Sequence, residues 1–262
     1  MSHYILPHSD PLEDDRLALM SKMLDPHMRF RLSQLGLGEG WRCLEVGAGN
    51  GTISQWLADQ VGPTGHVTAT DIDTAFLGKL ARDNLEVRQI DVTKDPLGKD
   101  YDLVCARALL HHIPDRLDVV ARLAAAVKPG GFILLEEPDF HPVEDTDSPA
   151  VRDFWRGFIA WAANCGIDYF IGRRLAPVLS KSGMTDIGVH GETILFQGGS
   201  LCARYWTLTF EELREPILAS GLITPTLWNE TLALFGNAEF WTWQNSFVAT
   251  SARKPDAGGA AA

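Results

Sequence analysis

Short apolar runs alternate with amphipathic stretches over much of the N-terminal half of the chain. The runs are bounded by glycine, aspartate or proline, which is typical of buried strands. They cover residues 42–47, 65–71, 85–91, 101–107 and 130–138. Between them, apolar residues recur at helical spacing over 52–61, 73–83 and 117–127. Buried strands that alternate with helices predict a parallel sheet with helices on both faces.

The pattern changes on either side of this region. Residues 12–35 carry apolar residues at helical spacing on both sides of Pro26, which predicts two helices ahead of the first strand. After Pro138 the pattern predicts helices over 148–165, 172–183 and 201–236, and strands over 186–197 and 245–253. The expected division is an N-terminal helical segment covering the site (1–35), a ligand-binding core (36–140), remaining core strands with lid insertions at about 140–172 and 198–244 (141–254), and a disordered tail (255–262).

A glycine-rich turn joins the first strand to its helix in "CLEVGAGNGTISQWLADQ". Gly47, Gly49 and Gly51 alternate at the carboxyl end of the strand, where such sheets bind ligands. Missing side chains allow a ligand to approach the backbone. The third glycine of a dinucleotide fingerprint is replaced by Thr52, and Glu45 would repel a pyrophosphate. The turn therefore favours a cationic ligand without phosphate, such as S-adenosylmethionine.

Two more acids stand at the ends of the next strands. Asp71 can accept hydrogen bonds from both ribose hydroxyls, although NAD would use an acid at the same place. Asp91 can accept from an adenine amino group, and Ile72 and Val92 offer apolar contact to the ring. A turn-forming role is the alternative for both aspartates. These acids are consistent with an adenosine ligand and do not identify it alone.

Five segments resemble, in order, the motifs of class I S-adenosylmethionine-dependent methyltransferases: "LEVGAGNGTIS", "TATDID", "IDVTKDP", "YDLVCARALLHHIPD" and "VKPGGFILLEEPD". The sequence of these segments is similar to that of actinobacterial members of this family that methylate small molecules. The resemblance implies an α/β, Rossmann-like, seven-stranded, mostly parallel sheet with an antiparallel last strand, N-terminal helices and a helical substrate cap. The expected cofactor is S-adenosylmethionine, with S-adenosylhomocysteine as product. The residues expected to hold it are Glu45, Gly47, Ala48, Gly49, Gly51, Asp71, Ile72, Asp91, Val92 and the backbone around Arg107.

The candidate catalytic residues are two adjacent histidines after the fourth strand. A sulfonium is a good leaving group, so the enzyme mainly positions the acceptor. A phenol or indole acceptor also needs a base, and His111 or His112 can serve, with an unperturbed pKa near 6.5. A structural role is the alternative for each histidine. The candidate acceptor contacts are Tyr4, Glu137, Asp139, Trp155 and Trp206.

Most aromatic residues fall within 151–247, which favours a flat, apolar acceptor, although many must pack the lid onto the core. The net charge of −11 argues against a nucleic-acid partner. The cysteines form no C-x-x-C pair, no metal-ligand pattern appears, and no signal or membrane segment is recognised. We therefore expect a cytoplasmic monomer or homodimer, without metal, membrane or nucleic acid, acting on a small molecule.

The resulting hypothesis is methyl transfer to O, N or C of a small aromatic or heteroaromatic natural-product acceptor. Three alternatives remain open at the level of sequence. They are a methyltransferase acting on a peptide, protein or RNA, a non-catalytic cofactor-binding module, and a nicotinamide oxidoreductase.

Overall fold

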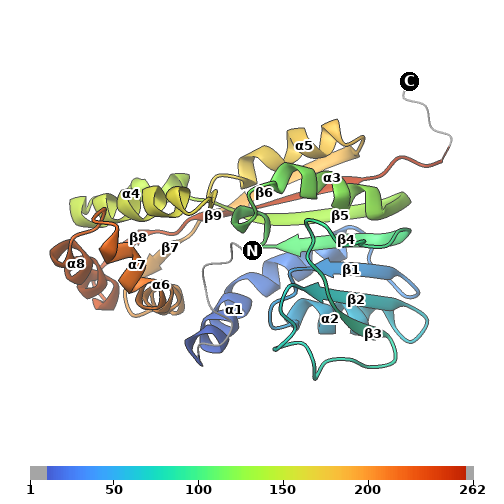
Figure 1. Ribbon diagram of the computed structural model, residues 1–262, viewed down its shortest axis with the longest axis horizontal. Helices are drawn as coiled ribbons and strands as arrows, with labels where there is room; N and C mark the ends of the chain where they lie inside the picture. The colour runs from blue at the N-terminus through green and yellow to red at the C-terminus, as the bar shows by residue number, and fades with distance from the viewer. Residues whose placement is uncertain (1–10, 258–262) are drawn as a thin grey trace.

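A seven-stranded sheet organises the molecule in the computed structural model, which describes residues 11–257. The strand order is β3-β2-β1-β4-β5-β9-β6 (Figure 1). The first five strands pair in parallel, and β9 runs antiparallel to both β5 and β6. The bounds are β1 Arg42–Val46, β2 His66–Asp71, β3 Leu85–Gln89, β4 Tyr101–Arg107, β5 Val127–Asp139, β6 Thr185–Glu192 and β9 Ser246–Arg253. The predicted Rossmann-like sheet with an antiparallel last strand is confirmed.

Both faces of the sheet are covered because the central strands are apolar on both sides. Leu44 and Val104 belong to a buried cluster with residues of α3 (Arg116–Ala126) and α5 (Leu175–Lys181). Their strand neighbours Cys43 and Leu103 pack in a second cluster, with residues of α1 and α2. The bounds of these two helices are Pro11–Gln34 and Thr52–Val61. The helices predicted after the first and fourth strands are therefore confirmed.

The two helices predicted ahead of the first strand are one continuous helix, α1, with Pro26 inside it. An interior proline removes one backbone donor and crowds the carbonyl four residues earlier, which costs about 3 kcal/mol. Leu24 and Met28, on either side of it, are buried, and Met28 packs against the sheet. Tertiary packing thus outweighs the local preference for a break.

The helix predicted over 73–83 is absent, and the chain makes turns there. The Asp73 side chain accepts a hydrogen bond from the backbone N–H of Ala75 at 2.9 Å, which favours a turn over a helix. Only Leu77 of this segment is fully buried, so there is no apolar stripe to hold a helix against the sheet.

The C-terminal half builds a separate lobe beyond the carboxyl ends of the parallel strands, here called the cap lobe (Figure 1). The strand predicted over 186–197 divides into β6 and β7, and the helical stretch 201–236 divides into three helices. The cap lobe comprises α4 (Pro149–Asn164), β7 (Leu195–Gln197), α6 (Leu201–Glu212), α7 (Arg214–Ala219), α8 (Pro225–Gly236) and β8 (Trp241–Trp243).

Side-chain caps and aromatic packing define the cap lobe. Ser148, Ser200 and Thr224 each accept a backbone N–H at the start of α4, α6 and α8. The lobe's core is largely aromatic: Phe140, Phe154, Trp155, Phe158, Trp206, Phe210, Trp228 and Phe235 are all buried there. The N-terminal half of α1 lies between this lobe and the sheet (Figure 1). Over residues 11–257, no helix combines the length and apolarity needed to cross a bilayer.

Candidate active site

A cavity of about 370 Å³ lies where the sheet, α1 and the cap lobe meet. Its volume falls in the range of small-molecule sites. One end is built by the carboxyl ends of β1, β2, β3 and β4 and the loops after them. The other end is built by residues of α1, α6 and the loops after β4 and β5.

The glycine turn leaves open space at the first end of the cavity. The N–H groups of Gly47 and Ala48 both donate to the Thr70 carbonyl, which fixes the turn against β2. Gly47 and Gly49 line the cavity and have positive φ angles of 72° and 56°. A Cβ on Gly49 would meet nothing closer than Leu17 at 3.8 Å. The turn is therefore a bare surface that a ligand can approach.

Gly51 and Ala48 do not line the cavity, contrary to the expectation that they bind the cofactor. A Cβ on Gly51 would lie 2.8 Å from Leu77, so packing against the 73–83 segment explains this glycine. Ala48 is buried beneath the turn.

Glu45 does not line the cavity either. Its side chain is buried and accepts a hydrogen bond from the Ser54 hydroxyl. Burial raises the pKa of Glu45 to about 7. The acid thus supports the first turn of α2. Its side chain does not reach the cavity, so the expected direct contact with the cofactor is not observed.

The two strand-end aspartates both line the cavity, together with Ile72 and Val92. Asp71 accepts the Gly49 N–H at 2.9 Å through Oδ2, so the acid and the glycine turn fix each other. Asp91 accepts both the N–H and the hydroxyl of Thr93, and this hydrogen bonding lowers the pKa of Asp91. The predicted adenosine-binding residues are thus brought together.

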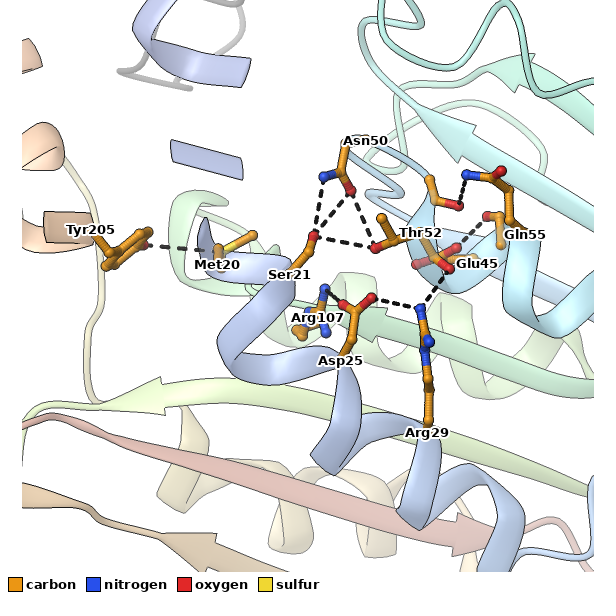
Figure 2. Close-up of polar contacts among 12 residues, drawn as sticks. Met20, Ser21, Asp25, Arg29, Glu45, Asn50, Thr52, Gln55, Arg107 and Tyr205 are labelled. Atoms are coloured by element: carbon orange, nitrogen blue, oxygen red, sulfur yellow. Dashed lines mark hydrogen bonds and ion pairs between the residues drawn. The ribbon is translucent and has the colours of Figure 1, made fainter. Parts of the chain in front are cut away.

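Helix α1 packs beside the glycine-turn end of the cavity and contacts it through polar residues that the sequence analysis did not identify. The Arg107 side chain lines the cavity and donates from Nη2 to Asp25 Oδ1 at 2.8 Å. Figure 2 shows Asp25 between Arg107 and Arg29, which donates to its other oxygen at 2.9 Å. Ser21 joins the side chains of Asn50 and Thr52 in a hydrogen-bond network at the glycine turn. The four-residue spacing of Ser21, Asp25 and Arg29, one polar face of a helix, is the signal that could have identified them.

His111 is paired with a buried carboxylate. Its Nδ1 lies 2.8 Å from Glu137 Oε2, and its ring lines the cavity. Glu137 is fully buried behind it and accepts the backbone N–H groups of Leu109 and Leu110 at 2.9 and 2.7 Å. Glu137 is therefore a partner of His111, and the expected direct acceptor contact is not observed.

Burial shifts both groups of this pair toward their uncharged forms. It lowers the pKa of His111 to about 3 and raises the pKa of Glu137 to about 7. When Glu137 is ionised it can only accept, so the proton of His111 sits on Nδ1 and Nε2 keeps its lone pair. This tautomer leaves Nε2 available to accept a proton. The His112 ring lies 3.8 Å from that of His111 and also lines the cavity, and burial lowers its pKa as well.

Five Phe, Tyr and Trp rings line the cavity: Phe140, Tyr169, Tyr205 and Trp206 at its far end, and Phe247. Phe140 and Tyr169 are stacked, with ring centroids 4.0 Å apart and planes 11° from parallel. Trp206 meets Phe140 edge-on at 5.6 Å. The expectation for Trp206 thus agrees with its position at the cavity.

Three other predicted acceptor contacts lie elsewhere. Trp155 does not line the cavity, because it is fully buried in the cap-lobe core and packs against Trp206. Asp139 forms two hydrogen bonds with Arg173, each 2.6 Å long, and stays outside the cavity. Tyr4 lies outside the described residues. No cluster of three or more His, Cys, Asp or Glu side chains that could hold a metal occurs in the described part of the chain.

Comparison with known proteins agrees with the methyltransferase resemblance of the five sequence motifs. The family described as "Methyltransferase domain" matches residues 44–133, from β1 into β5. Methyltransferase Str3 of Strobilurus tenacellus is 28% identical over 183 residues, covering 68% of this chain and 65% of its own length. The chain thus spans slightly less than two thirds of this relative.

Solved structures share the fold at low sequence identity. A methyltransferase-family structure from Bacillus halodurans C-125 is 20% identical, with a TM-score of 0.57 over 86% of this chain and 97% of that one. Phosphoethanolamine N-methyltransferase 2 of Haemonchus contortus, solved with S-adenosylhomocysteine, is 17% identical, with a TM-score of 0.54 over 93% of this chain and 53% of that one. These structures share the fold, and the bare glycine turn beside Asp71 lies within the matched domain. The chain carries a methyltransferase domain over residues 44–133, of the class I S-adenosylmethionine-dependent type.

Proposed function

We propose that this protein transfers a methyl group from S-adenosylmethionine to an oxygen, nitrogen or carbon atom of a small aromatic or heteroaromatic natural product. One observation carries the proposal. A single cavity has the glycine turn and Asp71 at one end, stacked aromatic rings at the other, and His111 on its wall. Donor and acceptor sites in one cavity are what a direct transfer between two bound molecules needs.

The first end of the cavity suits the cofactor. Asp71 is positioned to accept the ribose hydroxyls, and Ile72 and Val92 offer apolar surface to the adenine. Gly49 adds no side chain where the ligand must approach the backbone. When bound, S-adenosylmethionine supplies an electrophilic methyl group on a sulfonium, so the protein's main task is to position the acceptor.

The second end suits a flat acceptor. An aromatic ring placed against Phe140, Tyr169 or Trp206 gains about 0.5–1.5 kcal/mol beyond area burial, and stacking also fixes its orientation. The arginine nearest this end, Arg16, is already engaged by Glu13 through two contacts of 2.7 Å. This favours an uncharged ring over a phosphorylated acceptor of the kind that the Haemonchus enzyme holds.

His111 is the proposed base for an acceptor that must lose a proton. Its Nε2 takes the proton from the acceptor hydroxyl or ring N–H, while Glu137 holds the Nδ1–H and stabilises the imidazolium that forms. For an acceptor whose nucleophilic atom needs no deprotonation, His111 and the neighbouring cavity residues only orient the acceptor ring. Transfer to a peptide or RNA is the less favoured alternative, because the net charge is −11 and the site is covered by α1 and the cap lobe.

The test is an acceptor screen with S-adenosylmethionine carrying a radiolabelled methyl group. Phenols, indoles and hydroxylated heteroaromatics are compared with aliphatic amines, carboxylic acids and peptides, and products are identified by mass spectrometry. Labelling confined to the aromatic set supports the proposal. Labelling of only the aliphatic or peptide set would refute the flat-acceptor claim.

A further inference from the structure

Arg107 places a partly unpaired guanidinium beside the glycine turn. It ends β4, which pairs with β1 through Ala106 and Val46, and its side chain is 8% exposed. Nη2 donates to Asp25, whereas the buried Nη1 has no hydrogen-bond partner among the described residues. A buried donor on a cation is costly when it stays unpaired, so an anionic ligand oxygen at this position is favourable.

The acids around Arg107 have other partners. Glu136 is held by Arg31 at 3.2 Å, and Glu45 accepts from Ser54. Burial raises the pKa of both glutamates, to about 7 for Glu45, while the charge of Arg107 acts to lower it. Arg16, another arginine that lines the cavity, makes two 2.7 Å contacts with Glu13.

The sheet order indicates which part of the cofactor reaches Arg107. Asp91 and Asp71 stand at the ends of β3 and β2, where adenine and ribose are expected. The strands continue in the order β1 and then β4. The amino-acid part of the cofactor therefore extends over the glycine turn toward Arg107 and α1.

We infer that Arg107 binds the methionine carboxylate of S-adenosylmethionine and that Asp25, on α1, orients the guanidinium for this contact. The inference rests on the proposed function, because it takes the cavity to hold this cofactor. Arg107 is the ligand contact, and Asp25 is a positioning residue. Ser21, one helical turn before Asp25, is fixed to Asn50 of the glycine turn, so α1 forms part of the cofactor site.

The test measures binding and needs no acceptor. Dissociation constants are determined by calorimetry for S-adenosylhomocysteine and for its decarboxylated analogue, which lacks only the carboxylate. The wild-type protein should bind S-adenosylhomocysteine about 10–100-fold more tightly than the analogue. This comparison uses the unchanged chain, so it stands even if a variant fails to fold.

Variants then assign the preference to Arg107. In Arg107→Met the preference for the carboxylate should fall to within about twofold, and in Asp25→Asn to an intermediate ratio. Arg82→Met, an exposed arginine paired with Asp59, serves as a control and should keep the wild-type ratio. Equal binding of both ligands by the wild type, or a full preference in a folded Arg107→Met, overturns the inference. If the wild type binds neither ligand, both the proposed function and this inference are refuted.

Discussion

The imidazole of His111 and the carboxylate of Glu137 form a buried pair, with 2.8 Å between Nδ1 and Oε2. The same carboxylate accepts the backbone N–H groups of Leu109 and Leu110. One acid at the end of β5 thus fixes both the backbone after β4 and the tautomer of the histidine that lines the cavity.

The pair predicts how turnover depends on pH. Burial raises the pKa of Glu137 to about 7, so the carboxylate is ionised above that pH and holds the Nδ1–H of His111. Below it, protonation of Glu137 removes this acceptor, and the rate should fall as the pH decreases. The imidazole of His111 should give no change of rate near pH 6.5 in the pH–rate profile, because burial lowers its pKa to about 3.

Glu137→Gln should remove this limb and lower kcat by about 10²–10⁴, and His111→Ala should have a similar effect on kcat. The double variant should be no worse than either single one, because the two residues act as a unit. The affinity for S-adenosylhomocysteine serves as the control and should not change. A wild-type pH profile in Glu137→Gln would show that the pair is structural only.

The cofactor end gives a second prediction. Asp71→Asn removes a charged acceptor at the ribose position, so S-adenosylhomocysteine should bind about 1.5–3 kcal/mol more weakly. Asp73→Asn, two residues later and outside the cavity, is the matched control and should bind normally. Calorimetry measures both, and equal affinities in the two variants would contradict the assignment of Asp71.

The cap lobe offers a matched pair of tryptophans. Trp206 lines the cavity, whereas Trp155 packs against it from the core. Trp206→Phe should raise KM for the acceptor about 2–10-fold through lost stacking, and leave the cofactor affinity unchanged. Trp155→Phe should lower the free energy of unfolding and leave KM unchanged. If the KM increase follows Trp155 instead, the acceptor has been placed at the wrong end of the site.

Glu45 predicts a pH dependence of stability. Its pKa in the folded state, about 7, lies above the ordinary value of 4.5. Protonated Glu45 therefore contributes its full stabilisation below about pH 4.5. This contribution is lost as the pH rises through 7, which lowers the free energy of unfolding by about 3 kcal/mol. Glu137 acts in the same direction. Urea unfolding at pH 5.5 and 8.5 should show the wild type losing stability at the higher pH.

In Glu45→Gln this loss should be smaller, because the amide keeps an oxygen for the Ser54 hydroxyl and cannot ionise. An identical pH dependence in wild type and variant would mean that Glu45 is already charged in the folded protein at low pH.

The parallel sheet could be predicted because its central strands, β1, β2 and β4, are buried on both faces, and β1 and β4 consist largely of apolar residues. The ends of those strands also carried local signals, since only glycine allows the close approach at Gly49, and the aspartates stand directly after the apolar runs. These features depend on short stretches of chain. Gly47, Gly49, Asp71 and Asp91, all chosen from such local signals, line one cavity in the structure.

The parts that sequence did not resolve depend on packing between distant segments. Pro26 alone predicts a break, but buried neighbours hold α1 together. The pairing of Asp25 with Arg107 joins residues 82 positions apart. Helical spacing places Trp155 and Trp206 on buried faces, yet cannot say which ring faces a cavity. Glu45 likewise precedes the glycine turn in sequence while its side chain turns toward Ser54.

The central claim is that the cavity is a site for S-adenosylmethionine, and ligand titration of the unmodified protein tests it most directly. Calorimetry and thermal unfolding are carried out with S-adenosylhomocysteine and, separately, with NAD. Saturable binding of S-adenosylhomocysteine is predicted, with stabilisation of about 2.7 kcal/mol at a concentration 100 times its dissociation constant. NAD at the same concentration should give neither heat nor a shift in Tm. Binding of NAD without binding of S-adenosylhomocysteine would contradict the account.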